Sequence, residues 1–266
     1  MLFAWALIVV TTGACNEFTL SDGATAKTVF SDEKVWRLAQ AGARGDIEAM
    51  ERALKEGVDV NYIGEDTVTP LAWVLFARNK EGFLRLLQAG ANPNQKGLHD
   101  YSVTSTAAGM PDPGFLKTVL EHGGDPNIIG PDGDTTLHIA ITRHRWENMH
   151  ILLDRGADIN GRNVLGGETP VIHAAGFGQY EQVLYLLEKG ADYRLKDNTG
   201  YSLAETLVIF PTGDPVWKNK VKQYLEARGV RFDETKQQIL HRHLEEDCRS
   251  GKGLATLCEK LEREQQ

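Results

Sequence analysis

The sequence predicts an all-α fold, a solenoid of about six helix–turn–helix units with β-turn fingers, followed by a C-terminal helical hairpin. Two motifs predict it, because they recur in the same phase along 266 residues. Related pentapeptides begin at Gly57, Gly90, Gly123, Gly156 and Gly190, so their spacings are 33, 33, 33 and 34 residues. Related helix starts read Thr69-Pro70-Leu71, Thr135-Thr136-Leu137-His138-Ile139-Ala140 and Thr169-Pro170-Val171. Such a period is typical of stacked repeats, each of which buries its apolar face against its neighbours.

Each unit can be explained residue by residue. The threonine hydroxyl can cap the first helix, and proline suits the first helical turn. A second, antiparallel helix ends at the glycine, which adopts the left-handed conformation. The following Ala-Asp-x-Asn segment turns outward as a finger. These features resemble the ankyrin repeat, and the resemblance covers roughly residues 33–229.

We place the solenoid at residues 33–232. In the first unit the helix-start motif is degenerate at residues 36–41, which favours an N-terminal cap. The third unit is degenerate at residues 102–104, and Pro111 and Pro113 interrupt the turn between its helices. The sixth unit begins near residue 200, and a loop signal at residues 211–215 delays its second helix. Terminal units are expected to be atypical because one side faces water.

Residues 233–266 leave the repeat pattern and form a predicted C-terminal helical cap. Apolar residues at helical spacing predict two short helices joined at residues 251–253. Cys248 and Cys258 flank this turn, and we expect a disulfide between them; two unpaired thiols are the alternative. If this hairpin docked on the last repeat, it would cover the exposed apolar surface there. A hairpin that projects to bind a partner is the other possibility.

The N-terminus predicts an exported protein. Residues 2–10 are almost all apolar, a run too short for a membrane span but suited to a signal peptide. Thr12-Gly13-Ala14-Cys15 resembles a bacterial lipobox, although Thr12 stands where leucine is usual and no Lys or Arg precedes the run. We therefore expect a signal peptide at residues 1–14, a lipidated Cys15, a flexible linker at residues 15–32 and a membrane-anchored protein of the bacterial periplasm. A signal peptide without lipid or a buried N-terminal helix are the alternatives.

Composition and motifs argue against several functions. Apolar residues make up 41% and charged residues 25%, as in soluble globular domains. A net charge of −8 argues against a nucleic-acid binder. No nucleotide-binding loop, serine-hydrolase elbow or zinc-protease motif is present, so we expect no catalytic residue, metal, cofactor or small-molecule substrate. Three histidines need separate mention: His138 takes the structural position of the ankyrin motif, and His241 and His243 with their neighbouring glutamates predict a solvated helix face.

The repeated asparagines also predict a structural role. The ankyrin resemblance implies that Asn61, Asn94, Asn127 and Asn160 bond to loop backbone. Function is then expected on the surface, along the concave face built from finger tips and first-helix ends. Aromatic residues, methionine and arginine are enriched at such interfaces. The resemblance places eight residues there: Arg44, Phe76, Tyr101, Met110, Asp134, Arg143, Glu168 and Phe177. Some of them could instead pack between units; Trp73 and Trp146 are expected in the core.

The resemblance implies a non-catalytic module that binds a protein partner. One version is an immunity protein that inhibits a basic toxin or effector, since an acidic binder would attract a basic partner. A scaffold for a periplasmic enzyme or envelope complex is the alternative. An enzyme with its site at residues 201–217 or in the C-terminal hairpin is a third hypothesis, which a pocket of convergent titratable groups would support.

Overall fold

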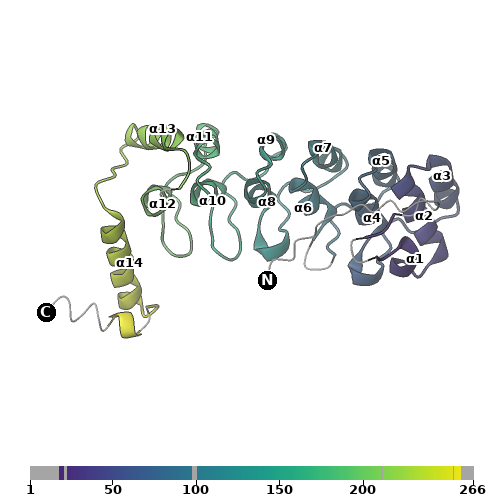
Figure 1. Ribbon diagram of the computed structural model, residues 1–266, viewed down its shortest axis with the longest axis horizontal. Helices are drawn as coiled ribbons and strands as arrows, with labels where there is room; N and C mark the ends of the chain where they lie inside the picture. The colour runs from purple at the N-terminus through teal and green to yellow at the C-terminus, as the bar shows by residue number, and fades with distance from the viewer. Residues whose placement is uncertain (1–17, 21–22, 98–100, 211, 254, 259–266) are drawn as a thin grey trace. The chain divides into compact units, whose positions relative to one another are not determined.

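The computed structural model describes residues 18–20, 23–97, 101–210, 212–253 and 255–258 (Figure 1). Over these residues the ordered elements are helices, with three isolated β-bridges between loop positions. The chain divides into two compact units, one up to Asp158 and one from Ile159. None of the described helices is both long enough and apolar enough to cross a membrane.

The first unit contains four helix pairs that match the first four predicted repeats. Its helices are α1 (Ala26–Val29), α2 (Glu33–Arg44), α3 (Ile47–Lys55), α4 (Pro70–Phe76), α5 (Lys80–Gln88), α6 (Val103–Ala108), α7 (Pro113–Glu121), α8 (Thr136–Thr142) and α9 (Trp146–Asp154), with 3₁₀ turns η1 (Glu65–Thr67) and η3 (Pro131–Gly133). The first helix of each pair contacts the first helix of the next, and the second helices do the same. The finger loops extend on the side of the first helices (Figure 1).

The second unit contains the fifth and sixth repeats and the C-terminal helix. Its helices are α10 (Pro170–Gly176), α11 (Tyr180–Glu188), α12 (Leu203–Ile209), α13 (Pro215–Glu226) and α14 (Lys236–Ser250). α10 packs on α12, α11 packs on α13, and α14 contacts α12. The predicted all-α architecture of paired helices with finger loops is therefore confirmed over the described residues.

Local sequence signals explain where these helices begin and end. The Thr69 hydroxyl accepts a hydrogen bond from the Ala72 amide at 3.2 Å and caps α4. Proline occupies the first turn of α4 and α10, as expected. Gly90 follows α5 with a φ of +91°, a conformation that a side chain would disfavour. The predicted caps are thus confirmed at Thr69 and Thr135 and the glycine stop at Gly90, whereas the Thr169 hydroxyl makes no capping hydrogen bond to α10.

The repeated asparagines connect neighbouring fingers. Asn94 donates to the carbonyl of Gly123 at 2.8 Å and accepts from the amide of Asp125 at 2.8 Å. Asn61 and Asn127 make the same two bonds to the fingers that follow them. Asn160 accepts from the amide of Asp192 at 2.8 Å. Their predicted structural role is confirmed, because each satisfies backbone groups that a turn leaves open.

The segment before the first repeat differs from the expected flexible linker. Over the described part of residues 15–32, helix α1 is capped by Thr25, and Phe30 is fully buried. The Phe30 ring packs edge-on against Trp73 and Tyr62. The prediction of a flexible linker is wrong there, because apolar residues of this segment pack on the first two repeats. The predicted lipidation site Cys15 and the signal peptide at residues 1–14 lie outside the described residues.

The C-terminal region begins with the predicted helix and turn. α14 ends at Gly251, which has a φ of +74°. A disulfide joins Cys248 and Cys258, whose Cα atoms are 5.6 Å apart. Residues 255–258 are helical, and the rest of the expected second arm lies outside the described residues.

Candidate protein-binding face

Six of the eight predicted interface residues lie in the first unit. Arg44, Tyr101 and Arg143 are exposed, and Tyr101 retains 39% of its accessible surface. Phe76 and Asp134 are half-buried. The finger loops and first-helix ends of this unit therefore present both aromatic and charged side chains to a partner.

Met110 does not belong to this surface. It is only 9% exposed, so its assignment to the interface is wrong. The buried amide of Asn148 donates to the carbonyls of Ala108 and Met110, both at 2.9 Å. These bonds hold the turn after α6 against α9 and leave Met110 in the packed interior. Trp146 differs from its prediction in the opposite sense. It is expected in the core, but it lies at the start of α9 and is only half-buried.

The remaining two predicted residues, Glu168 and Phe177, lie in the second unit and are linked through His173. The Glu168 carboxylate lies 2.6 Å from His173 Nδ1, and the His173 ring packs edge-on against Phe177 at 5.0 Å. Phe177 is 51% exposed. A carboxylate, an imidazole and an exposed phenyl ring thus follow one another from the finger to the end of α10.

The N-terminal segment covers part of the face in the first unit. The Phe18 ring packs edge-on against Trp73 at 5.1 Å, and the Phe18 backbone amide lies 3.2 Å from the side-chain amide of Gln40. The repeat spacing makes Thr106 and Ile139 the equivalents of Trp73, and both are partly exposed whereas Trp73 is fully buried. The accessible part of this face therefore lies mainly on the third and fourth repeats.

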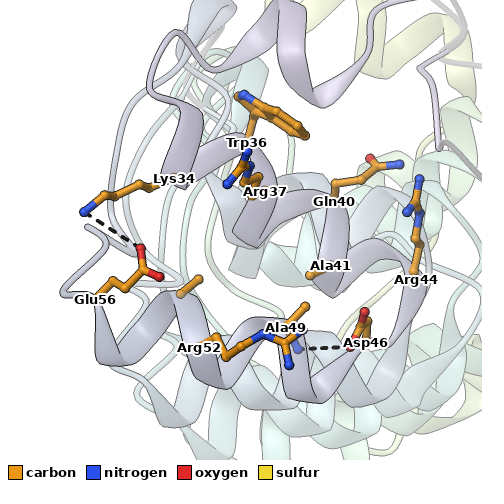
Figure 2. Close-up of a pocket in the computed structure, with 11 residues that line it drawn as sticks. Lys34, Trp36, Arg37, Gln40, Ala41, Arg44, Asp46, Ala49, Arg52 and Glu56 are labelled. Carbon is orange, nitrogen blue, oxygen red and sulfur yellow. Dashed lines mark hydrogen bonds and ion pairs between the residues drawn. The ribbon is translucent and has the colours of Figure 1, made fainter.

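A groove of about 350 Å³ lies on the outer side of the first repeat (Figure 2). Ala41 and Ala49 lie among the residues that line it, and Lys34 and Glu56 form an ion pair at 3.8 Å at one side. This side of α2 and α3 is where a preceding repeat would stack. Its charged side chains fit the predicted N-terminal cap, because such a cap must tolerate water.

The histidines do not form a metal site in the part of the chain that the structure describes. His138 is fully buried, and its Nδ1 lies 2.7 Å from the Thr135 hydroxyl, which confirms its structural role. His243 is also buried, so the predicted solvated face holds for half-exposed His241 but not for its neighbour. The His243 ring packs on Tyr201 with centroids 4.0 Å apart.

A charged cluster fastens α14 to α12. Glu205 accepts hydrogen bonds from the Ser202 hydroxyl and Arg242, both at 2.6 Å. Burial alone would raise the pKa of Glu205, but the hydrogen bonds from Ser202 and Arg242 outweigh it and lower the pKa to about 2. The hydrogen bonds that Arg242 donates to Glu234 and Glu205 raise the pKa of Arg242 above its usual value. Sequence reasoning missed this cluster, because Glu205 and Arg242 are 37 residues apart.

Sequence reasoning also missed the finger of the fifth repeat. Val164 and Leu165 are highly exposed on it. The one signal for it is the spacing of 34 residues between Gly156 and Gly190, where the other intervals are 33.

Comparisons with known proteins agree with the repeat. Residues 105–197 match the model for ankyrin repeats in three copies. Protein PhlB of Serratia liquefaciens is 34% identical over 131 residues, which are 44% of this chain and 58% of PhlB. The human B-cell lymphoma 3 protein is 27% identical over 142 residues, 50% of this chain and 31% of that protein. The chain thus spans less than two thirds of the length of these relatives.

Solved structures show the same architecture. The ankyrin repeat domain of Bcl-3 has a TM-score of 0.65 at 23% identity, over 76% of this chain and 90% of that domain. An ankyrin repeat domain from Acinetobacter baumannii has a TM-score of 0.64 at 25% identity, over 73% of this chain and 98% of that domain. The chain contains ankyrin repeats, and such repeats are protein-binding modules that are generally not catalytic.

Proposed function

We propose that this chain binds a protein partner through the finger and first-helix surface of its ankyrin repeats, without catalysing a reaction. The observation that carries the proposal is the exposure of Tyr101 and Phe177 at these positions. Aromatic side chains dominate protein interfaces, because they bury much apolar area with few rotatable bonds. The asparagine bonds between fingers keep this surface ordered before a partner arrives, which lowers the entropic cost of binding.

The partner we propose is basic, and the chain inhibits it, as an immunity protein inhibits a toxic effector. The support is the net charge of −8, from 37 acidic and 29 basic residues. A negative surface accelerates encounter with a basic protein and disfavours acidic ones. Binding should therefore weaken with increasing salt. A scaffold for an envelope complex is the second candidate, and a housekeeping partner in place of a toxin would favour it.

We also propose that the protein acts in the bacterial periplasm, anchored by lipid on Cys15. The disulfide between Cys248 and Cys258 supports an oxidising compartment, because such bonds are rare in the cytosol. Replacing Cys15 with serine should release the protein from the membrane fraction and remove an acyl group detected by mass spectrometry. Continued membrane attachment of this variant would contradict the anchor.

The binding face can be tested with matched variants once a periplasmic partner has been purified. Tyr101→Glu and Phe177→Arg place charges in the face, whereas Leu84→Arg places one on an exposed position of α5 outside it. We expect each face variant to lose at least about 30-fold in affinity by calorimetry, the effect of a strong interface residue. Leu84→Arg should bind like the wild type. Unchanged affinity in both face variants would refute the proposal.

A further inference from the structure

The finger of the fifth repeat is one residue longer than its counterparts. From Asn160 to Thr169 the chain advances nine positions, whereas the equivalent step from Asn127 to Thr135 is eight. The longer finger carries Val164 and Leu165, which are 63% and 74% exposed. No other large apolar side chain among the described residues is as exposed as either of them.

Hydrogen bonds within the finger hold this tip in one shape. The backbone amide of Asn163 donates to the Glu168 carbonyl at 3.0 Å. The backbone amide of Glu168 donates to the side-chain oxygen of Asn163 at 3.0 Å. The Gly167 amide donates to the Asn163 carbonyl at 3.2 Å. Asn163 itself is buried, so the loop closes around a satisfied polar side chain.

The finger of the sixth repeat braces the tip from the side. Asn198 donates through its backbone amide to the Gly166 carbonyl at 2.8 Å and through its side chain to the Leu165 carbonyl at 3.3 Å. Arg162 donates to the Gly167 carbonyl at 2.7 Å. Gly167 has a φ of +62°, and a Cβ there would lie 2.1 Å from the Asn198 side chain. The positive φ therefore favours glycine at this position, and the carbonyls of Leu165, Gly166 and Gly167 all accept hydrogen bonds.

Two adjacent aliphatic side chains on a braced loop contribute nothing to the fold while they face water. Scattered apolar side chains are common on surfaces, but contiguous ones mark interaction sites. Because the loop is already ordered, a partner that buries both side chains gains their full hydrophobic energy without ordering the backbone. The tip also continues into the proposed face through Glu168, His173 and Phe177.

We propose that Val164 and Leu165 form an anchor that inserts into an apolar cleft of the protein partner. This inference rests on the proposed protein-binding function and names the part of the surface that enters the partner. A narrow, projecting tip fits a cleft better than a flat surface. A lipid surface is disfavoured because the chain carries a net charge of −8, which anionic headgroups repel.

Photo-crosslinking in the full chain identifies what the tip touches. A benzophenone amino acid is placed at Leu165, at Phe177 and, as the control, at Leu84 of α5 in cells that produce the protein. We expect crosslinks to one protein from the first two positions and none from the control, with the Leu165 crosslink mapping to residues that line an apolar cleft. A crosslink from Leu165 to a second copy of this chain would overturn the inference in favour of self-association.

Affinity measurements with that purified protein then test the energetic role of the tip. The double variant Val164→Ser/Leu165→Ser should lose at least about 30-fold in affinity. The matched control is Val216→Ser, an aliphatic side chain 60% exposed on α13, outside the finger and first-helix surface, which should lose less than about threefold. Both variants should keep the thermal midpoint of the wild type, because the replaced side chains are exposed.

The outcomes separate this inference from the proposed function. Crosslinks from Phe177 alone, with full affinity in the double variant, would overturn the anchor and leave the binding face standing. No crosslinked protein from any position would refute the proposed function itself. Binding of the wild type to phosphatidylglycerol vesicles that the double variant loses would assign the tip to a membrane and overturn the inference.

Discussion

Replacing Glu205 with glutamine is expected to loosen α14 from α12. In the wild type the carboxylate accepts from the Ser202 hydroxyl and from Arg242, and His243 lies 3.3 Å away. Glutamine has nearly the same shape but only one oxygen and no charge. It can keep the bond from Ser202, but it leaves the guanidinium of Arg242 without its most buried partner.

The size of the effect follows from the pKa of Glu205, which falls from 4.5 to about 2 on folding. Each pKa unit corresponds to about 1.4 kcal/mol, so the ionised carboxylate stabilises the folded state by about 3 kcal/mol. Part of this comes from Ser202 within α12, and the part that acts on α14 is the bond from Arg242. A charge-assisted hydrogen bond contributes about 1.5–3 kcal/mol, so the variant should open α14 about 10- to 100-fold more often at neutral pH.

The stabilisation depends on pH with a definite sign. Since the pKa is lower in the folded state, the contribution is fully present above pH 4.5 and is lost as the pH falls toward 2. Wild-type α14 should therefore lose protection over this range. The Glu205→Gln variant should lack this part of the pH dependence.

Hydrogen exchange of the α14 amides, read against those of α12, measures the opening directly. The control is Glu234→Gln, which removes a second carboxylate from Arg242 at a half-exposed position. Exposed ion pairs contribute at most about 1 kcal/mol, so this variant should change exchange less than tenfold. Equal effects of both substitutions, or unchanged α14 exchange in Glu205→Gln, would refute the reasoning.

Three further predictions test the packing. Phe30→Ala should lower the free energy of unfolding by about 3–5 kcal/mol in urea titration, because the side chain is fully buried, whereas exposed Phe177→Ala should change it by less than about 0.5 kcal/mol. Asn94→Ala leaves the Gly123 carbonyl unpaired and should cost about 1–3 kcal/mol, with faster amide exchange in that finger; unchanged exchange would argue against the bond. Cys248→Ser should cost about 2–3 kcal/mol locally, seen as faster proteolysis after α14; equal cleavage of both proteins would contradict this.

Much of the repeat could be predicted because its signals are local. The Thr69 cap, the proline in the first turn and the Gly90 stop each act within a few residues, and the 33-residue period repeats them. The asparagine bonds were also predictable, since each joins equivalent positions of adjacent fingers. A periodic sequence thereby encodes both the unit and its contact with the next.

The errors involve contacts between residues that are not equivalent in the repeat. Met110 was assigned to the surface, but Asn148, 38 residues later, holds its turn in the interior. His243 was assigned to solvent, but Tyr201 and Glu205 cover it. Neither partner can be found from helical spacing, which describes one helix at a time.

The sequence by itself determined the repeat, its helix starts and glycine stops, and its acidic charge. Only the tertiary structure decided which side chains remain exposed on that framework. It buried Met110 and His243, and it left Val164 and Leu165 exposed on a braced loop. The physical reason is that helix signals depend on near neighbours, whereas burial depends on which distant segments meet.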